Sequence, residues 1–319
     1  MGRFGLRAGF RSPQFLVSDD TVTEANTPRS SRRVIEFQGE RREYWLHVPP
    51  NLDASSPIPL VLLLHGAGGT GRWAMDETRI REHADRWGWF VVAPNGTPPA
   101  RDEPASFLHN PRLWNDGSRR GMIANLGTDD VAFLDHLLAT LTAQLPVDPR
   151  RVFATGFSNG ASMVFRLAAE GATRLAAIAP VASHAWVVGP PAPRPMPTLF
   201  IIGDADPLVP LAGGQVRTPW SSQSAPKPPI REMLDRWAVA QGHVPLPALV
   251  SRAGGVRVER YGAGDSGAEF RVMIVEGLGH HWPGGLARLN PRIAGAASER
   301  LDATREIGEF FARRPLPLA

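Results

Sequence analysis

Short runs of consecutive apolar residues recur along the chain, separated by stretches in which apolar residues lie three and four positions apart. A short run that is apolar on both faces is typical of a strand buried between two layers of helices. Such runs predict strands over residues 59–64, 89–94, 151–156, 177–181, 198–202 and 270–275. Two further strands, over residues 34–37 and 43–48, are predicted to form an antiparallel pair.

Helical periodicity occupies the segments between these strands. It predicts helices over residues 129–138, 158–170, 230–241 and 298–312. Strands that alternate with helices favour an α/β fold with a mostly parallel central sheet and helices on both faces. In such sheets ligands bind at the carboxyl ends of the strands, so functional residues are expected in the loops there.

The two longest segments without a predicted element lie at the N-terminus and before the helix predicted over residues 129–138. Residues 1–30 have no periodicity and carry Ser, Thr, Asp and Pro, which indicates a flexible N-terminal arm. Residues 97–127 indicate a long loop insertion, and a loop of this length is more often functional than idle. The periodic pattern outside the arm predicts a single domain over residues 31–315.

The start of the chain and its longest apolar runs bear on localisation. Residues 1–10 are basic but lack the following apolar stretch of about 7–15 residues that a secretory signal requires. The longest apolar runs, such as 60–64, are far shorter than the roughly 20 residues that span a bilayer. We therefore expect no membrane partner, and a cytoplasmic protein or a secreted one whose leader has been removed.

Charge and cysteine content exclude several classes of function. The 35 basic residues exceed the 31 acidic ones by only four, and Lys227 is the only lysine. The arginines are scattered among acids and are not clustered with aromatic residues, so no nucleic-acid partner is expected. Because the chain has no cysteine, it has no disulfide, thiolate zinc site, iron–sulfur cluster or cysteine nucleophile. We expect neither a metal nor a cofactor.

A candidate nucleophile lies where a predicted strand turns directly into a predicted helix. The segment there reads Gly156-Phe157-Ser158-Asn159-Gly160. This context is the one in which G-x-S-x-G exposes a reactive serine, because the two glycines remove side chains that would collide in the turn. The N–H groups at the start of the helix would favour negative charge beside Ser158. The alternative interpretation is an ordinary turn with a capping serine.

A serine needs a base that is itself held by an acid. The strand over 198–202 is followed by two candidate acids, Asp204 and Asp206, and the strand over 270–275 by two candidate bases, His280 and His281. Both pairs would reach the same edge of a parallel sheet as Ser158. Spacing alone does not choose within either pair.

A glycine-rich loop supplies the expected oxyanion hole. It reads Leu64-His65-Gly66-Ala67-Gly68-Gly69 and follows a buried strand. The backbone N–H groups of Ala67 and Asn159 are the expected donors to a tetrahedral oxygen, and His65 and Gly66 are expected to support the loop. The loop lacks the Gly-Lys-Ser/Thr ending of a phosphate-binding loop, so nucleotide binding is not expected.

Taken together, these motifs resemble the polyhydroxybutyrate depolymerase and feruloyl esterase branch of the α/β-hydrolases. The resemblance covers roughly residues 33–311 and includes the Asn after the serine and the stretch His280-His281-Trp282-Pro283-Gly284. It implies an α/β-hydrolase fold and a serine esterase that works through an acyl-enzyme. It also implies that Asp206 is the acid and that His280, the first histidine of His-x-Trp-Pro, is the base.

The resemblance implies aromatic (feruloyl-type) esters or short 3-hydroxyalkanoate esters as substrates. Trp282, Trp114 and Trp186 are the candidate substrate-binding residues, with Phe107 and Trp220 near the same rim. Secreted members of the branch rely on disulfides, which this chain lacks, so secretion and a polymeric substrate are less strongly implied. The alternatives are a non-catalytic binding protein on the same fold, a depolymerase acting on polymer, and a peptidase or acyltransferase. The sequence carries no indication of the oligomeric state.

Overall fold

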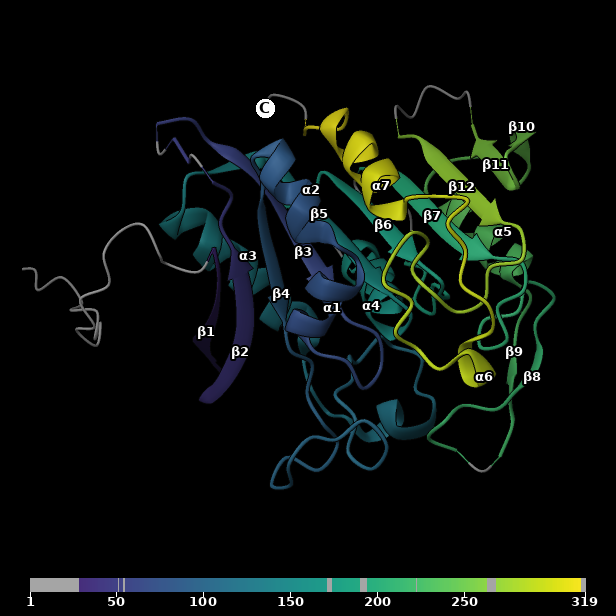
Figure 1. Cartoon of the computed structure of the whole chain (residues 1–319), viewed down its shortest axis with the longest axis horizontal. Coiled ribbons are helices and arrows are strands. Elements are labelled where there is room, and N and C mark those ends of the chain that lie inside the picture. The colour runs from purple at the N-terminus through teal and green to yellow at the C-terminus, as the bar shows by residue number, and fades with distance from the viewer. Residues whose placement is uncertain are drawn as a thin grey trace, which may run out of the picture.

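In the computed structural model of the protein, a ten-stranded sheet organises the fold. The structure describes residues 29–50, 52–53, 55–170, 174–189, 194–221, 223–262 and 268–316. The strands lie in the order β1-β2-β4-β3-β5-β6-β7-β12-β11-β10 (Figure 1). The predicted N-terminal arm, residues 1–30, falls almost wholly outside the described residues.

The centre of the sheet is parallel and its two margins are antiparallel. The parallel strands are β3 (Ile58–Leu64), β4 (Phe90–Pro94), β5 (Val147–Phe157), β6 (Ala177–Val181), β7 (Thr198–Gly203) and β12 (Phe270–Val275). The marginal strands are β1 (Ser30–Phe37) and β2 (Glu40–His47) on one side and β10 (Pro247–Ala253) and β11 (Val256–Tyr261) on the other. The predicted α/β fold with a mostly parallel sheet is confirmed, and so is the first antiparallel pair.

Each face of the sheet is covered by helices. Along β3, Leu60, Leu62 and Leu64 pack into one apolar cluster and Val61 and Leu63 into the other. Because successive side chains of a strand point to opposite faces, both faces of β3 are buried. The first cluster includes α3 (Asp130–Gln144), α4 (Asn159–Ala169) and α5 (Ile230–Ala240). The second includes α1 (Gly71–Glu77), α2 (Ile80–Trp87) and α7 (Ala303–Ala312).

The remaining elements lie outside this framework. They are a short 3₁₀ helix η2 (Gly121–Asn125), the short helix α6 (Pro291–Ala294), and a separate pair of strands, β8 (Gly214–Val216) and β9 (Ala225–Lys227). The segment 97–127 has otherwise little regular structure and loops out at the lower side of the view in Figure 1. Among the described residues, no helix is long and apolar enough to cross a membrane.

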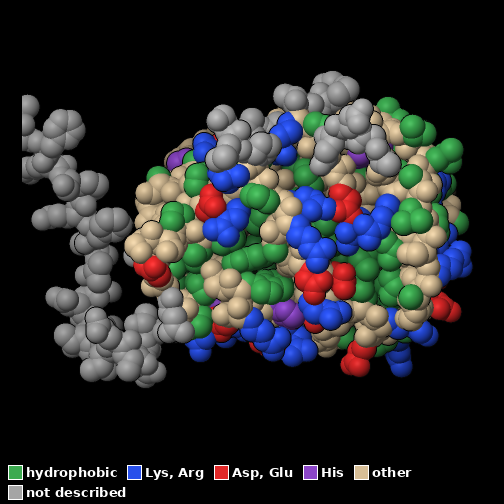
Figure 2. Space-filling view, turned by 90° about the horizontal axis from the view of Figure 1, so that it is seen from above, with side chains coloured by type: hydrophobic (Ala, Val, Ile, Leu, Met, Phe, Trp, Pro, Cys, Tyr) green, Lys and Arg blue, Asp and Glu red, His purple; other side chains and the backbone are tan. Residues whose placement is uncertain are grey.

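The surface charges are mixed. Figure 2 shows Lys and Arg side chains interspersed with Asp and Glu on the face seen from above. Ion pairs between the two kinds of charge are frequent, and Glu269 alone pairs with Arg260, Arg271 and Arg314. The arginines are thus interleaved with acids on this face, as the sequence suggests.

Candidate active site

Ser158 occupies a sharp turn between β5 and α4. Its backbone has φ 54° and ψ −120°, a conformation that residues other than glycine rarely adopt. The turn also packs tightly against the end of β3. A Cβ on Gly160 would lie 2.4 Å from the carbonyl oxygens of both Leu64 and His65. Glycine at position 160 therefore allows the turn to close, and Ser158 is held at the carboxyl edge of the sheet.

Ser158, His280 and Asp206 form a continuous chain of hydrogen bonds. The His280 Nε2 atom lies 2.9 Å from Ser158 Oγ, and His280 Nδ1 lies 2.7 Å from Asp206 Oδ2. With Nδ1–H donating to the carboxylate, Nε2 is free to accept the serine proton. The residues come from the ends of β5, β7 and β12, which explains how segments far apart in sequence meet here.

Asp206, the acid in this chain of hydrogen bonds, is buried and is held by its own loop. Its other oxygen, Oδ1, accepts hydrogen bonds from the backbone N–H groups of Leu208 and Val209, at 2.8 and 2.7 Å. Burial alone would raise the pKa of Asp206, but His280 and these two donors outweigh burial and lower the pKa below its ordinary value. The carboxylate is therefore ionised at neutral pH.

The neighbouring residues that spacing left open lie elsewhere. Asp204 is exposed, and its Oδ1 accepts a hydrogen bond from the Gly277 N–H at 2.7 Å. His281 is buried, and its Nε2–H donates to the carbonyl of Gly295 at 3.0 Å. Both side chains hold loops around the site in place, and neither is hydrogen-bonded to Ser158. The structure thus brings Asp206 and His280 to the serine, as the resemblance implies.

His65 stabilises the predicted oxyanion loop through its hydrogen bonds. Ala67 and Asn159 both line the cleft beside Ser158. His65 is fully buried; its Nδ1–H donates to the Gly66 carbonyl at 2.7 Å and its Nε2 accepts from the Gly96 N–H at 2.9 Å. Burial lowers the pKa of His65 to about 4, so the ring is neutral. His65 has the supporting position that the sequence suggests.

The side chain of Asn159 ties the nucleophile turn to the 97–127 segment, a role that spacing did not reveal. Its Oδ1 accepts from the Trp114 N–H at 2.8 Å, and its Nδ2 donates to the Trp114 carbonyl at 3.0 Å and to Asp116 at 2.9 Å. The only available signal in the sequence was that Asn follows the serine in the family that the chain resembles. Three hydrogen bonds from one side chain fix the loop over the helix start.

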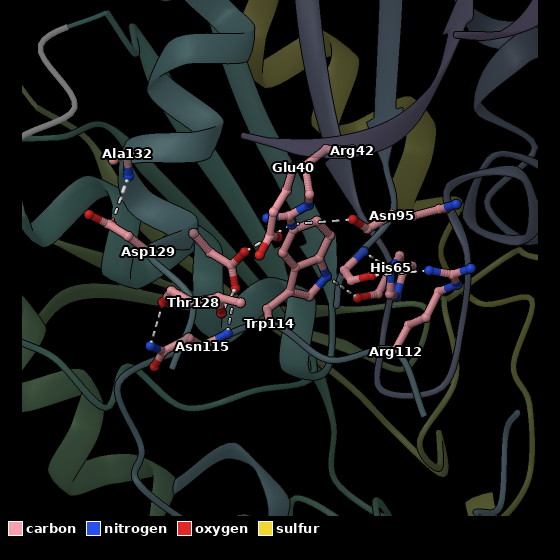
Figure 3. Close-up of polar contacts among 12 residues, drawn as sticks. Glu40, Arg42, His65, Asn95, Arg112, Trp114, Asn115, Thr128, Asp129 and Ala132 are labelled. Carbon is pink, nitrogen blue, oxygen red and sulfur yellow. Dashed lines mark hydrogen bonds and ion pairs between the residues drawn. The ribbon is translucent and has the colours of Figure 1, made fainter. Parts of the chain in front are cut away.

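A buried ion pair between Arg42 and Asp130 holds the same loop from the opposite side. Figure 3 shows Arg42, Asn115 and Thr128 in this network, beside His65 and Trp114. The Arg42 guanidinium lies 3.0 Å from Asp130, whose second oxygen accepts from the Asn115 N–H at 2.8 Å and the Thr128 hydroxyl at 3.0 Å. The position of residues 114–116 is thus set from both sides.

The cleft above Ser158 has a volume of about 660 Å³. Aromatic side chains form much of its wall: Trp73, Phe107, Phe157, Trp186 and Trp220. The Trp220 indole N–H donates to the Phe107 carbonyl at 2.6 Å, and the two rings lie 5.4 Å apart. The 97–127 segment therefore meets the loop before β9 across the cleft.

Two of the three predicted substrate-binding tryptophans do not line this cleft. Trp114 is fully buried, and its indole N–H donates to the His65 carbonyl at 3.0 Å (Figure 3). Trp282 is also buried, within the second apolar cluster, and its indole N–H donates to the Thr304 hydroxyl at 2.9 Å. For these two residues the prediction is wrong, because each ring turns inward to fill the core under its loop. Trp186 does lie in the cleft wall, and its contact with substrate stays a prediction.

Comparison with known proteins agrees with this architecture. A family model described as esterase PHB depolymerase matches residues 42–198. "Putative esterase NocK" of Nocardia uniformis subsp. tsuyamanensis is 30% identical over 309 residues, which cover 91% of this chain and 84% of the relative. Feruloyl esterase C of Emericella nidulans is 32% identical over 198 residues, which cover 60% of this chain and 67% of the relative.

Solved structures agree in fold. The acetyl xylan esterase from Aspergillus awamori superposes with a TM-score of 0.56 at 14% identity, covering 88% of this chain and 99% of that one. An S-formylglutathione hydrolase from Agrobacterium tumefaciens gives 0.54 at 13% identity, covering 91% and 98%. At such identities the likeness establishes the α/β-hydrolase fold alone. The sequence relatives establish the family: the chain belongs to the esterases of the polyhydroxybutyrate depolymerase and feruloyl esterase type.

Proposed function

We propose that the protein is a serine esterase that hydrolyses carboxylic esters through an acyl-enzyme on Ser158. The observation that carries the proposal is the hydrogen-bonded chain Ser158–His280–Asp206, which opens into the aromatic cleft. Names of the sequence relatives, which include feruloyl esterases, support ester hydrolysis as the reaction class.

In the first half of the reaction, Ser158 Oγ attacks the ester carbonyl while His280 Nε2 takes the serine proton. The carbonyl oxygen becomes an oxyanion, which the N–H groups of Ala67 and Asn159 stabilise. A donor of this kind contributes about 100–1000-fold in rate. Asp206 holds the ring orientation and stabilises the imidazolium. The intermediate then collapses, the C–O bond to the alcohol breaks, and His280 gives its proton to the leaving alcohol.

In the second half, water replaces the alcohol. His280 removes a proton from the water, whose oxygen attacks the acyl carbon of the Ser158 ester. A second tetrahedral intermediate forms in the same oxyanion site. Its collapse releases the carboxylic acid and returns the proton to Ser158 Oγ, so the enzyme is regenerated.

As substrates we propose esters with an aromatic acyl group or short 3-hydroxyalkanoate esters, because the lining of the cleft suits both. Aromatic walls stack well on a hydroxycinnamoyl ring and also bury the apolar backbone of a short polyester. Phe107, Trp186 and Trp220 are the residues that would contact either acyl group.

A fluorophosphonate probe and 4-nitrophenyl butyrate test the proposal. The wild type is expected to react covalently at Ser158 and to hydrolyse the ester. Ser158→Ala is expected to lose labelling and turnover while keeping its circular dichroism spectrum and unfolding midpoint. Unlabelled wild type without turnover would support the non-catalytic binding protein instead, and full activity of Ser158→Ala would place the nucleophile elsewhere.

A further inference from the structure

One corner of the cleft carries positive charge that the hydrolysis itself does not use. Lys227, the only lysine of the chain, lies at the end of β9, and Arg120 directly precedes η2; both line the cleft. The Lys227 ammonium donates to the Leu208 carbonyl at 2.6 Å. Arg120 donates to the Pro226 carbonyl and lies over the Trp186 ring, 4.7 Å from its centre. Within the described residues, neither cation is paired with an acidic side chain.

The same corner holds buried polar atoms without hydrogen-bond partners. Across the part of the chain that the structure describes, these include Ser183 Oγ and both ring nitrogens of His184. Both residues line the cleft, and each is only 2% exposed. Buried polar atoms are almost always paired, so unpaired atoms in residues that line a cleft point to a ligand that supplies the partner.

The acids near this corner are already engaged. Asp116 accepts from the Ser118 N–H through one oxygen and from Asn159 Nδ2 through the other. Asp206 is turned toward His280 and its own loop. Among the described residues, Lys227 and Arg120 therefore meet no free carboxylate at this corner.

The protonation states of the corner agree with a site for an anion. Burial, with the nearby cations adding to it, lowers the pKa of His184 to about 3, so its ring is neutral. Burial lowers the pKa of Lys227 to about 8, which still leaves the ammonium protonated at pH 7. Asp206 and Asp116 offset part of this cost from a distance, but a largely buried cation without a direct ion-pair partner is still costly, and an anionic ligand group would lower that cost.

We propose that the corner formed by Lys227, Arg120, Ser183 and His184 binds a carboxylate carried by the ester substrate. This inference rests on the esterase function proposed above and narrows its substrate to esters with a free carboxylate. A carboxylate has enough acceptor positions for the two cations and the serine hydroxyl together. The corner adjoins the acid loop, because Lys227 bonds to Leu208 and Leu208 bonds to Asp206. Of the two proposed substrate classes, a short 3-hydroxyalkanoate oligomer ends in such a group, whereas methyl ferulate has none.

Paired esters that differ by one charge test the inference. With the carboxylate on the acyl side, 4-nitrophenyl hydrogen adipate is compared with 4-nitrophenyl hexanoate, which has a methyl in its place. With the carboxylate on the alcohol side, 4-hexanoyloxybenzoate is compared with 4-methylphenyl hexanoate. The readout is the ratio of kcat/KM for the charged and the neutral ester of each pair. A ratio cancels differences in folded fraction and in the intrinsic rate of the enzyme.

The wild type is expected to favour the charged ester in at least one pair by about tenfold or more, the scale of a hydrogen bond to a charged group. Lys227→Met and Arg120→Met are each expected to lower that ratio by roughly tenfold. Arg174→Met is the matched control: it removes one positive charge from an exposed pair with Asp135, away from the cleft, and should leave the ratio unchanged. If Lys227→Met disturbs the loop that carries Asp206, Arg120→Met still tests the site, because among the described residues Arg120 does not bond to that loop.

Failure of this inference is distinguishable from failure of the proposed function. Hydrolysis of the neutral esters with no charge preference in either pair, or with a preference that both variants retain, would overturn the carboxylate site while leaving the esterase in place. Absence of hydrolysis of all four esters, together with no fluorophosphonate labelling, would overturn the esterase function itself.

Discussion

Replacing Asp206 by Asn keeps the size of the side chain and removes its charge. The amide oxygen of the new side chain would take over the hydrogen bonds from Leu208 and Val209, because those backbone groups are donors 2.7–2.8 Å away. The amide NH₂ would then face His280 Nδ1, which in the wild type lies 2.7 Å from a carboxylate oxygen. To accept that hydrogen bond, the ring must move its proton to Nε2, the nitrogen that faces Ser158.

This change removes the base from the reaction. A ring protonated on Nε2 cannot take the serine proton, so we expect Asp206→Asn to lower kcat by about 1,000–10,000-fold. The assay is the steady-state hydrolysis of 4-nitrophenyl butyrate, with circular dichroism to verify folding. Asp204→Asn is the matched control, because Asp204 is exposed and, among the described residues, its side chain bonds only to the Gly277 N–H; it should change kcat less than about fivefold. Small and equal losses in both variants would refute the assignment of Asp206 as the acid.

Three further predictions concern stability around the site. Gly160→Ala places a methyl 2.4 Å from two carbonyl oxygens of the β3 end, so it should cost about 1–3 kcal/mol in urea unfolding and reduce kcat; wild-type values in both assays would contradict the close packing. Asp130→Asn leaves Arg42 buried without its counter-ion and should lower the free energy of unfolding by about 3–5 kcal/mol, whereas a loss below about 1 kcal/mol would mean that water reaches the pair. The pKa of His65 falls to about 4 on folding. Below pH 6.5 the unfolded chain therefore binds a proton at this histidine that the folded chain does not bind, and the free energy of unfolding decreases as the pH is lowered. Between pH 7 and pH 5 this effect lowers the free energy of unfolding by about 2 kcal/mol. In urea unfolding at the two pH values, His65→Gln should therefore lose about 2 kcal/mol less stability than the wild type. An equal loss in variant and wild type would contradict the prediction.

The sequence predicted the central sheet well because its strands are buried on both faces. A continuous apolar run such as 59–64 leaves few alternatives once helical periodicity flanks it. The edge hairpin β10–β11 escaped prediction because the apolar run at the start of β10 is only four residues long and β10 is largely exposed, so it lacks the pattern of a buried strand. The last helix begins at Ala303, where Asp302 caps it by accepting from the Arg305 N–H, and not at 298.

At the site, the strand ends pointed to the loops that carry Ser158, Asp206 and His280, but loop conformations decided the rest. The sequence places Trp114 and Trp282 in loops beside the serine, yet it cannot show which side of a loop a ring faces, and both rings face the core. Lys227 and Arg120 lie far apart along the chain in segments without periodicity, although they line one corner. Only the folded arrangement of these irregular segments brings their charges together.

The single lysine has a practical consequence for handling the protein. Besides the terminal amine, Lys227 is the only primary amine that the sequence offers to an acylating reagent or an aldehyde, and it lines the substrate cleft. Immobilising the protein through amine coupling at Lys227 would therefore attach the support at the cleft and block access to it. The same position makes Lys227 a selective place for an isotope label: reductive ¹³C-methylation would give one side-chain resonance, and that resonance would report directly on occupancy of the cleft.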